Sequence, residues 1–317
     1  MKLNEIYRFI VREGMHEDFR KKNEIHKKLL DAKRRYQKCK GIEKKLFDAE
    51  QLANPYADTR ILYGSPTINI ERLLVGIDME VGEILLAQEL AKKGKAIDLI
   101  LSHHPEGRAL AALDDVMGLQ VDILSQKGLN YSIAKDLMEK RMKEVSRRLH
   151  AGNYARAVDA ARLLNIPFMC CHTPSDNHVA RYLQKTMDRK KPKNLKNVLD
   201  LLMKEPEYRD ATRNNVGPRI LVGKPEDKAG KIMVDMTGGT EGSKEVFARL
   251  SQAGIKTLLC MHLSDQHFEK VKNEHIHVII AGHISSDNIG LNLLLDKLEK
   301  KERLDVIECS GFKRFKR

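Results

Sequence analysis

The stretch LLVGIDMEVGEILLAQELAKKGKAIDLILSHHP, residues 73–105, decides the fold class of this chain. Residues 73–77 and 97–101 are short apolar runs, which favour buried strands. Residues 80–94 between them have a helical period and a stop at Gly94. A strand, a helix and a strand in this order predict a βαβ unit, with parallel strands joined by a right-handed crossover.

The same alternation of strand and helix signals returns in the second half of the chain. Helical patterns at 243–252 and 287–299 separate several of the later apolar runs. Further strands are expected at 167–171, 219–222, 231–236, 257–261, 277–281 and 305–309. The chain is therefore predicted to be an α/β protein, a layered α/β/α sheet with helices on both faces.

Two regions depart from this alternation. Residues 1–60 are charge-rich and lack β-branched runs, so we expect a basic helical extension that ends near Asn54-Pro55, followed by a loop through residues 64–66. Residues 61–317 then form the α/β domain, and the segment around 107–165 contains helical patterns without a convincing strand. The sequence thus predicts an N-terminal helical extension and an inserted helical segment.

Charge and composition narrow the classes of function. The net charge is +13, and the excess is concentrated in residues 20–45, 189–196 and 313–317. Such runs bind phosphate-rich partners or are solvated helix faces and tails. The 16 aromatic residues include no Trp and are too sparse for the stacking platforms of single-strand binders, so nucleic-acid binding stays possible without being required.

The location of the protein is predicted from what the sequence lacks. No apolar stretch approaches the length of a membrane span, and the N-terminus lacks a secretory apolar segment, so we expect a cytoplasmic protein without a membrane partner. Five cysteines without a CxxC spacing argue against a disulfide framework and against a Cys-based zinc site.

Histidines follow four of the predicted strands directly. They are His103 and His104 after one strand, and His172, His262 and His283 after three others. The pattern H-x-x-S-D-N occurs twice, at 172–177 and 283–288, each time between an apolar run and a helical pattern. Ser-Asp-Asn before a helix is also ordinary N-cap chemistry. The conjunction of several such sets at one sheet edge nevertheless predicts a site for Zn²⁺, Mn²⁺, Fe²⁺ or Co²⁺.

A glycine-rich stretch at residues 235–243 follows a strand and precedes a helix. Gly238 and Gly239 lie at its centre, and it is either a plain tight turn or a site for a phosphate or oxyanion. It lacks the dinucleotide and P-loop fingerprints. Asp78, His262 and His267 reach the same predicted edge, either to orient ligands or substrate or as ordinary residues at a strand end or helix start.

Four motifs carry a resemblance over residues 66–317. They are the strand–HHP turn at 100–105, HTxxD at 172–176, the TGGTEG loop at 237–242 and GHxxSD at 282–287. Together they resemble the Nif-three-like dinuclear-metal proteins, a family also known as GTP cyclohydrolase 1 type 2. The resemblance implies two divalent metal ions per chain, and the ligands that it implies are His103, His104, Asp176, His283 and Asp287. His172 is implied as a neighbour of the site, and Asp287 stands where the family commonly has glutamate.

The resemblance also implies partners and an activity. Ring-like homo-oligomers, often hexamers, are typical of the family. The function predicted first is metal-assisted hydrolysis of a nucleotide-like or phosphate-bearing small molecule, GTP by resemblance. The alternatives are a metal-binding regulatory or scaffold protein whose working surface is the basic extension, and nucleic-acid binding by that extension.

Overall fold

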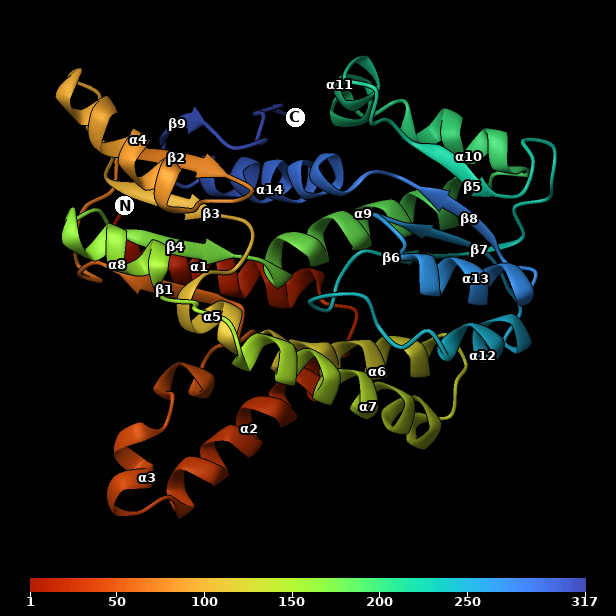
Figure 1. Cartoon of the computed structure of the whole chain (residues 1–317), viewed down its shortest axis with the longest axis horizontal. Coiled ribbons are helices and arrows are strands. Elements are labelled where there is room, and N and C mark those ends of the chain that lie inside the picture. Colours follow the sequence, from red (N-terminus) through yellow and green to blue (C-terminus); the bar gives the residue numbers. More distant parts are fainter.

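The computed structural model describes all 317 residues of the chain, which form helices and two β-sheets (Figure 1). The helices are α1 (Leu3–Glu17), α2 (Lys22–Lys38), α3 (Gly41–Leu46), α4 (Val81–Lys92), α5 (Gly107–Ala111), α6 (Gly118–Gln126), α7 (Tyr131–His150), α8 (Arg156–Leu163), α9 (Thr173–Lys190), α10 (Leu195–Leu202), α11 (Pro206–Arg213), α12 (Val246–Gln252), α13 (Asp265–Asn273) and α14 (His283–Glu299), with 3₁₀ turns η1 (Ala49–Leu52) and η2 (Leu113–Met117). The strands are β1 (Thr59–Tyr63), β2 (Arg72–Gly76), β3 (Leu99–Ser102), β4 (Phe168–Cys171), β5 (Arg219–Val222), β6 (Lys231–Asp235), β7 (Ile255–Cys260), β8 (His277–Ile280) and β9 (Asp305–Glu308).

Each sheet is mostly parallel and has one antiparallel edge strand. The first has the order β1-β4-β3-β2-β9 and the second the order β5-β8-β7-β6. Strands β2 and β3 pair in parallel, with Leu73 opposite Leu99, as the βαβ pattern predicts. The antiparallel strands are β1, paired with β4, and β5, paired with β8.

The division into two sheets corrects one expectation. The histidine-bearing strands were predicted to share one sheet edge, but β3 and β4 belong to the first sheet, whereas β7 and β8 belong to the second. Figure 1 shows the two sheets at opposite sides of the molecule, with α9 and α14 running between them. Apolar runs indicate which segments are buried strands, but the choice of pairing partner depends on contacts between distant segments.

A second correction concerns residues 55–66, for which no strand was predicted. They contain β1, which lies at the edge of the first sheet. Arg60, the second residue of this strand, is buried, and its Nη2 pairs with Asp48 Oδ2 at 3.0 Å. A buried arginine interrupts the apolar pattern on which strand prediction depends. Its ion pair with Asp48 and its hydrogen bonds to backbone carbonyl oxygens make the burial tolerable.

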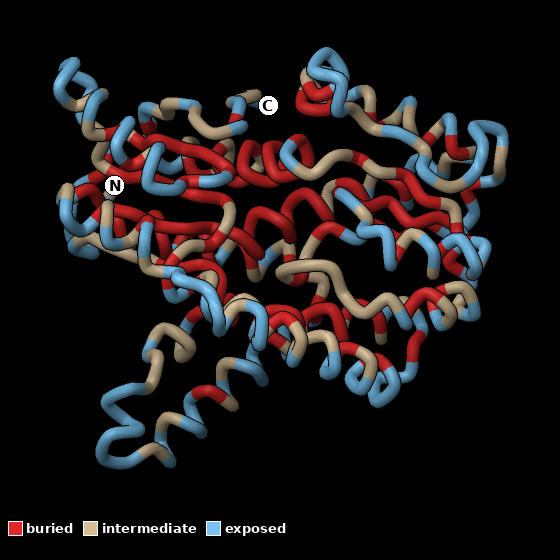
Figure 2. Tube along the Cα trace, viewed as in Figure 1, coloured by how far each residue is buried: buried red, intermediate tan, exposed pale blue.

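Helices cover both faces of each sheet, which confirms the predicted fold class. The first sheet packs against α1 and α14 on one face and against α4 and α8 on the other. The second packs against α9 and α10 on one face and against α6, α7, α12 and α13 on the other. Figure 2 shows the buried residues running through both sheets and along α9 and α14, so the region between the sheets is part of the buried core.

The first 60 residues contain two different structural parts. Helix α1 packs in the main core, where Leu3, Ile6 and Ile10 are fully buried. Helices α2 and α3 project from the body of the molecule (Figure 1), and α3 has no buried residue. No helix of the chain combines the length and apolar character needed to cross a bilayer.

Candidate metal centre

Three histidines present the same ring nitrogen to a common point. The Nδ1 atom of His103 lies 3.2 Å from the carbonyl oxygen of Cys171, and that of His104 lies 2.6 Å from Asp78 Oδ1. The Nδ1 atom of His172 lies 2.9 Å from Asp58 Oδ2. Because each acceptor holds a proton on Nδ1, the Nε2 lone pair is left free, as in histidines that bind metal ions. One ligand atom from each of the three rings lies within 4.8 Å of the others.

Two buried aspartates face these imidazoles. Asp287 Oδ1 lies 3.3 Å from His103 Nε2, while Asp287 Oδ2 lies 3.6 Å from the Nε2 atoms of His104 and His283. Asp176 lies on the other side of His103, with Oδ1 3.4 Å from His103 Nε2. The two oxygens of Asp287 thus face different histidines, although aspartate is one methylene shorter than the glutamate common at this position in the family that the sequence resembles.

Two helices that begin directly after strands place the carboxylates. Helix α9 follows β4 and has Pro174 in its first turn, where its missing N–H costs no hydrogen bond. Helix α14 follows Gly282, whose φ of 103° favours glycine. In each helix the aspartate lies four residues after the strand-end histidine and therefore on the same helical face.

A glycine holds these two helices close together. A Cβ atom at Gly290 of α14 would lie 2.4 Å from the carbonyl oxygen of Ser175 on α9, closer than real Cβ contacts. Ser175 precedes Asp176, and Gly290 lies about one turn after Asp287. The close approach at Gly290 therefore helps to bring the two carboxylates to one place.

The electrostatics of the cluster are those of a cation site. Burial lowers the pKa of His103, but Asp287 and Asp176 outweigh it and raise this pKa to about 10. Burial raises the pKa of Asp287, and the positive charge of His103 outweighs it and lowers this pKa to about 2. Burial and the neighbouring His103 lower the pKa of His104 to about 4. The buried carboxylates thus require a positive charge among them, which a proton on His103 or a metal ion supplies.

Unpaired polar atoms show that the residues fit metal ions. His103 Nε2, Asp176 Oδ1 and both oxygens of Asp287 are buried without a hydrogen-bond partner. Leaving such atoms unpaired is costly, and a divalent cation satisfies them. Ligand atoms of His103, Asp176 and Asp287 lie within 4.8 Å of one another, and so do those of His104, His283 and Asp287. The two groups share Asp287, so the donors suit a pair of ions.

The remaining predicted residues lie around this cluster or away from it. His262 is next to it, with its ring centroid 4.9 Å from that of His283. His267 is directed elsewhere, since its Nε2 lies 3.0 Å from the carbonyl oxygen of Gly242 and its Nδ1 lies 2.8 Å from Ser264 Oγ. Gly238 is buried against Gln120, whose Nε2 donates to the carbonyl oxygens of Gly238 and Thr240 at 2.8 and 2.6 Å.

The comparison with solved structures supports a NIF3-like family. The structure of a NIF3 superfamily protein from Sphaerobacter thermophilus matches 81% of this chain and 92% of its own, with a TM-score of 0.71 and 28% sequence identity. This chain is a NIF3-like protein. Reduced HcgD from Methanocaldococcus jannaschii matches 83% of the NIF3-like chain and 93% of its own, at 16% identity and a TM-score of 0.48. A Bacillus cereus protein related to NIF3 matches 80% and 90%, at 12% identity and a TM-score of 0.41. Searches of protein-family models and of curated proteins return no match.

One residue of the NIF3-like site, Asp58, was not predicted from the sequence. Asp58 is fully buried just before β1, and its Oδ2 accepts hydrogen bonds from the Thr173 hydroxyl at 2.5 Å and from His172. No local motif marks it, because its partners lie more than 110 positions away in the sequence. An isolated Asp after Asn-Pro-Tyr-Ala reads as a loop residue until the fold is known.

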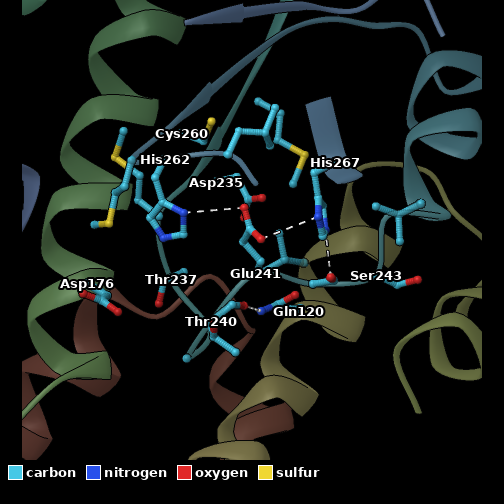
Figure 3. Close-up of a pocket in the computed structure, with 18 of the residues that line it drawn as sticks. Gln120, Asp176, Asp235, Thr237, Thr240, Glu241, Ser243, Cys260, His262 and His267 are labelled. Carbon is cyan, nitrogen blue, oxygen red and sulfur yellow. Dashed lines mark hydrogen bonds and ion pairs between the residues drawn. The ribbon is translucent and has the colours of Figure 1, made fainter. Parts of the chain in front are cut away.

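A pocket opens beside the His/Asp cluster of the NIF3-like chain (Figure 3). Four residues of the cluster region lie in its wall, namely His172, Asp176, His283 and Asp287. From there it extends past the glycine-rich loop, including Thr237 and Gly239, to side chains of α6 and α12. No lysine or arginine is among its 25 lining residues. The pocket thus gives a ligand access to the cluster.

Proposed function

We propose that this NIF3-like protein is a metal-dependent hydrolase with two divalent ions per chain. The observation that carries the proposal is the buried Asp287, whose two unpaired oxygens face separate groups of histidines. His103 and Asp176 would hold one ion, and His104 and His283 the other, with Asp287 shared. These N and O donors suit Zn²⁺, Mn²⁺, Fe²⁺ or Co²⁺.

A bound pair of ions supplies a Lewis acid and an acidified water as nucleophile. The residues of this chain contribute orientation and access. Asp78 and Asp58 fix the ring orientations of His104 and His172 through Nδ1. His262 is half exposed beside His283, and its Nδ1 lies 3.5 Å from Glu241 Oε1, so it is placed to hydrogen-bond a substrate at the mouth of the cluster.

The proposed substrate is a nucleotide-like or phosphate-bearing small molecule, GTP by family resemblance. Because the pocket wall contains no lysine or arginine, a phosphate group would have to be held at the metal centre. The apolar part of the pocket is then free for the remainder of the molecule. We therefore expect a substrate with its phosphate at one end and a less polar group at the other.

The test is reconstitution with each metal, followed by assays against a panel of nucleotides. His104→Ala removes a proposed ligand, and His26→Ala is the matched control because His26 is exposed on the projecting α2. We expect turnover that His104→Ala abolishes and His26→Ala leaves intact. Turnover that survives His104→Ala, or no turnover with any metal, would exclude the hydrolase at this site.

A second candidate function rests on the projecting arm formed by α2 and α3. Residues 20–45 contain twelve Lys or Arg against three Asp or Glu, and Figure 1 shows this arm standing away from the body. We propose for it contact with nucleic acid, in a regulatory or scaffold role. Salt-sensitive RNA or DNA binding that disappears when residues 22–46 are replaced by a short Gly-Ser linker would support this role. Unchanged binding would exclude the arm as the contact surface.

A further inference from the structure

The pocket wall combines a group of apolar side chains with a carboxylate that has no hydrogen-bond partner. Met233 on β6 and Phe247 and Leu250 on α12 belong to its wall, together with Ile123 and Leu124 on α6. All five pack in the core of the second sheet. A ligand part that enters here is removed from water and gains the stabilisation of apolar burial.

The carboxylate is that of Asp235, the last residue of β6. Its side chain is exposed and lines the pocket, and no hydrogen bond acts on it. Desolvation by the surrounding protein, together with the charge of Glu241, raises its pKa to about 6. A group that is open to the pocket yet desolvated by its walls lies in a concave site.

The neighbouring Glu241 has a different role, because its oxygens are already engaged. Its Oε1 accepts a hydrogen bond from the Ser264 N–H at 2.7 Å, and both oxygens lie 3.5 Å from histidine nitrogens, those of His262 and His267 (Figure 3). These contacts fix Glu241 as part of the loop structure. Asp235 beside it keeps both of its oxygens available.

The two basic side chains that act on Asp235, His262 and Lys127, have partners of their own. His262 and Lys127 lower the pKa of Asp235, but by less than desolvation and Glu241 raise it. Lys127 does not line the pocket, and its Nζ donates to Gln184 Oε1 at 3.1 Å. The pocket therefore offers the carboxylate of Asp235 beside apolar side chains, in a wall that contains no lysine or arginine.

We propose that this pocket binds the amidine-type or amine end of a substrate, with Asp235 accepting its N–H groups, while the bond to be hydrolysed lies at the metal centre. The inference rests on the proposed function only in taking the metal cluster as the place of reaction. A planar amidinium group presents two parallel N–H donors, which match a carboxylate in bidentate geometry. A carboxylate or phosphate end would instead meet the negative charge of Asp235 in a wall without lysine or arginine and be rejected.

The test uses benzamidine and benzamide as matched probes on the full, metal-loaded protein. The two molecules have nearly the same shape, but only benzamidine is cationic and has the paired donors. We expect benzamidine to bind at least tenfold more tightly than benzamide in calorimetry. Equal affinity would overturn the inference, and this comparison needs no variant.

Variants then locate the contact. Asp235→Asn keeps the size of the side chain and removes its charge, and Asp200→Asn on the exposed face of α10 is the matched control. We expect Asp235→Asn to weaken benzamidine binding at least tenfold and Asp200→Asn to leave it unchanged. Binding that is indifferent to Asp235→Asn would overturn the assignment.

The two proposals fail separately. Benzamidine binding is measured without turnover, so it can succeed in a protein that hydrolyses nothing, and then only the proposed hydrolase fails. Hydrolysis of a substrate whose KM is unaffected by Asp235→Asn would leave the hydrolase standing and contradict the role of Asp235.

Discussion

Replacing Gly290 by alanine tests whether the contact between α9 and α14 positions the metal ligands. The added Cβ atom would lie 2.4 Å from the Ser175 carbonyl oxygen and 2.6 Å from its Oγ. The carbonyl belongs to the backbone and cannot rotate away like a flexible side chain. Relief therefore requires the helices to separate by about 1 Å, roughly the deficit relative to ordinary van der Waals contact.

The expected cost follows from two opposing contributions. Overpacking of this kind costs about 1–3 kcal/mol, whereas alanine in a helix interior gains about 1 kcal/mol over glycine. Gly82 in α4 provides the control, because a Cβ atom there meets nothing within 4 Å. Gly82 lies in the first turn of α4, so Gly82→Ala has part of this gain and no clash. We therefore expect Gly290→Ala to be less stable than Gly82→Ala by up to about 3 kcal/mol.

Metal affinity is a more specific test of this contact than stability. A ligand set must be held within about 0.5 Å of its working geometry, and Asp176 and Asp287 lie on the two helices that would separate. We expect Gly290→Ala to bind metal at least tenfold more weakly, measured by competition with a chelator, and Gly82→Ala to bind as the parent does. Equal metal affinity in all three proteins, with no loss of unfolding free energy in Gly290→Ala, would refute the positioning role of this contact.

Three further predictions concern other parts of the molecule. Asp78→Asn weakens the hydrogen bond that orients His104, so we expect metal affinity to fall about 10–100-fold. Thermal stability should change little, because Asp78 is largely exposed. Asp159→Asn on the surface of α8 is the control, and unchanged metal affinity in Asp78→Asn would contradict this prediction. Burial raises the pKa of Glu17, but Lys297, whose Nζ donates to it at 2.9 Å, outweighs burial and lowers that pKa to about 2. The stabilisation that the Glu17 carboxylate gives the fold is thus complete above its ordinary pKa of 4.5 and is lost as the pH falls toward 2. The deficit in melting temperature of Glu17→Gln should therefore be largest at pH 6 and shrink below pH 4.5. A constant deficit down to pH 3 would be the contrary result. Replacing residues 22–46 by a Gly-Ser linker should leave metal content unchanged, because the arm contributes no residue to the cluster; loss of metal on that replacement would show that the arm supports the site.

Most strands were predictable because their evidence is local. Residues 73–77, 97–101 and 219–222 are apolar runs bounded by turn residues, and β2, β3 and β5 lie at or within two residues of them. The pairing of strands into two sheets was not predictable, because hydrophobic runs do not specify their neighbours. Strand β1 was missed because the buried Arg60 interrupts its pattern, and its ion pair with Asp48 appears only in the folded chain.

The candidate site divides in the same way. Strand-end histidines and the aspartates four residues later are visible in the sequence, and the structure brings His103, His104, His172, His283 and both aspartates together. The hydrogen-bond acceptors that select the free ring nitrogen were only partly visible. Asp78 was found because it ends a predicted strand, whereas Asp58 meets His172 only through the fold. Contacts across more than a hundred residues leave no spacing to read.

The central claim is that Asp287 is shared by two metal ions. Its most direct test is elemental analysis of the protein after reconstitution with each candidate metal, with Asp287→Asn measured in parallel. We expect two ions per chain in the parent protein and a loss of at least one ion in Asp287→Asn. No more than one ion per chain in the reconstituted parent, whichever of the four metals is used, would contradict the claim.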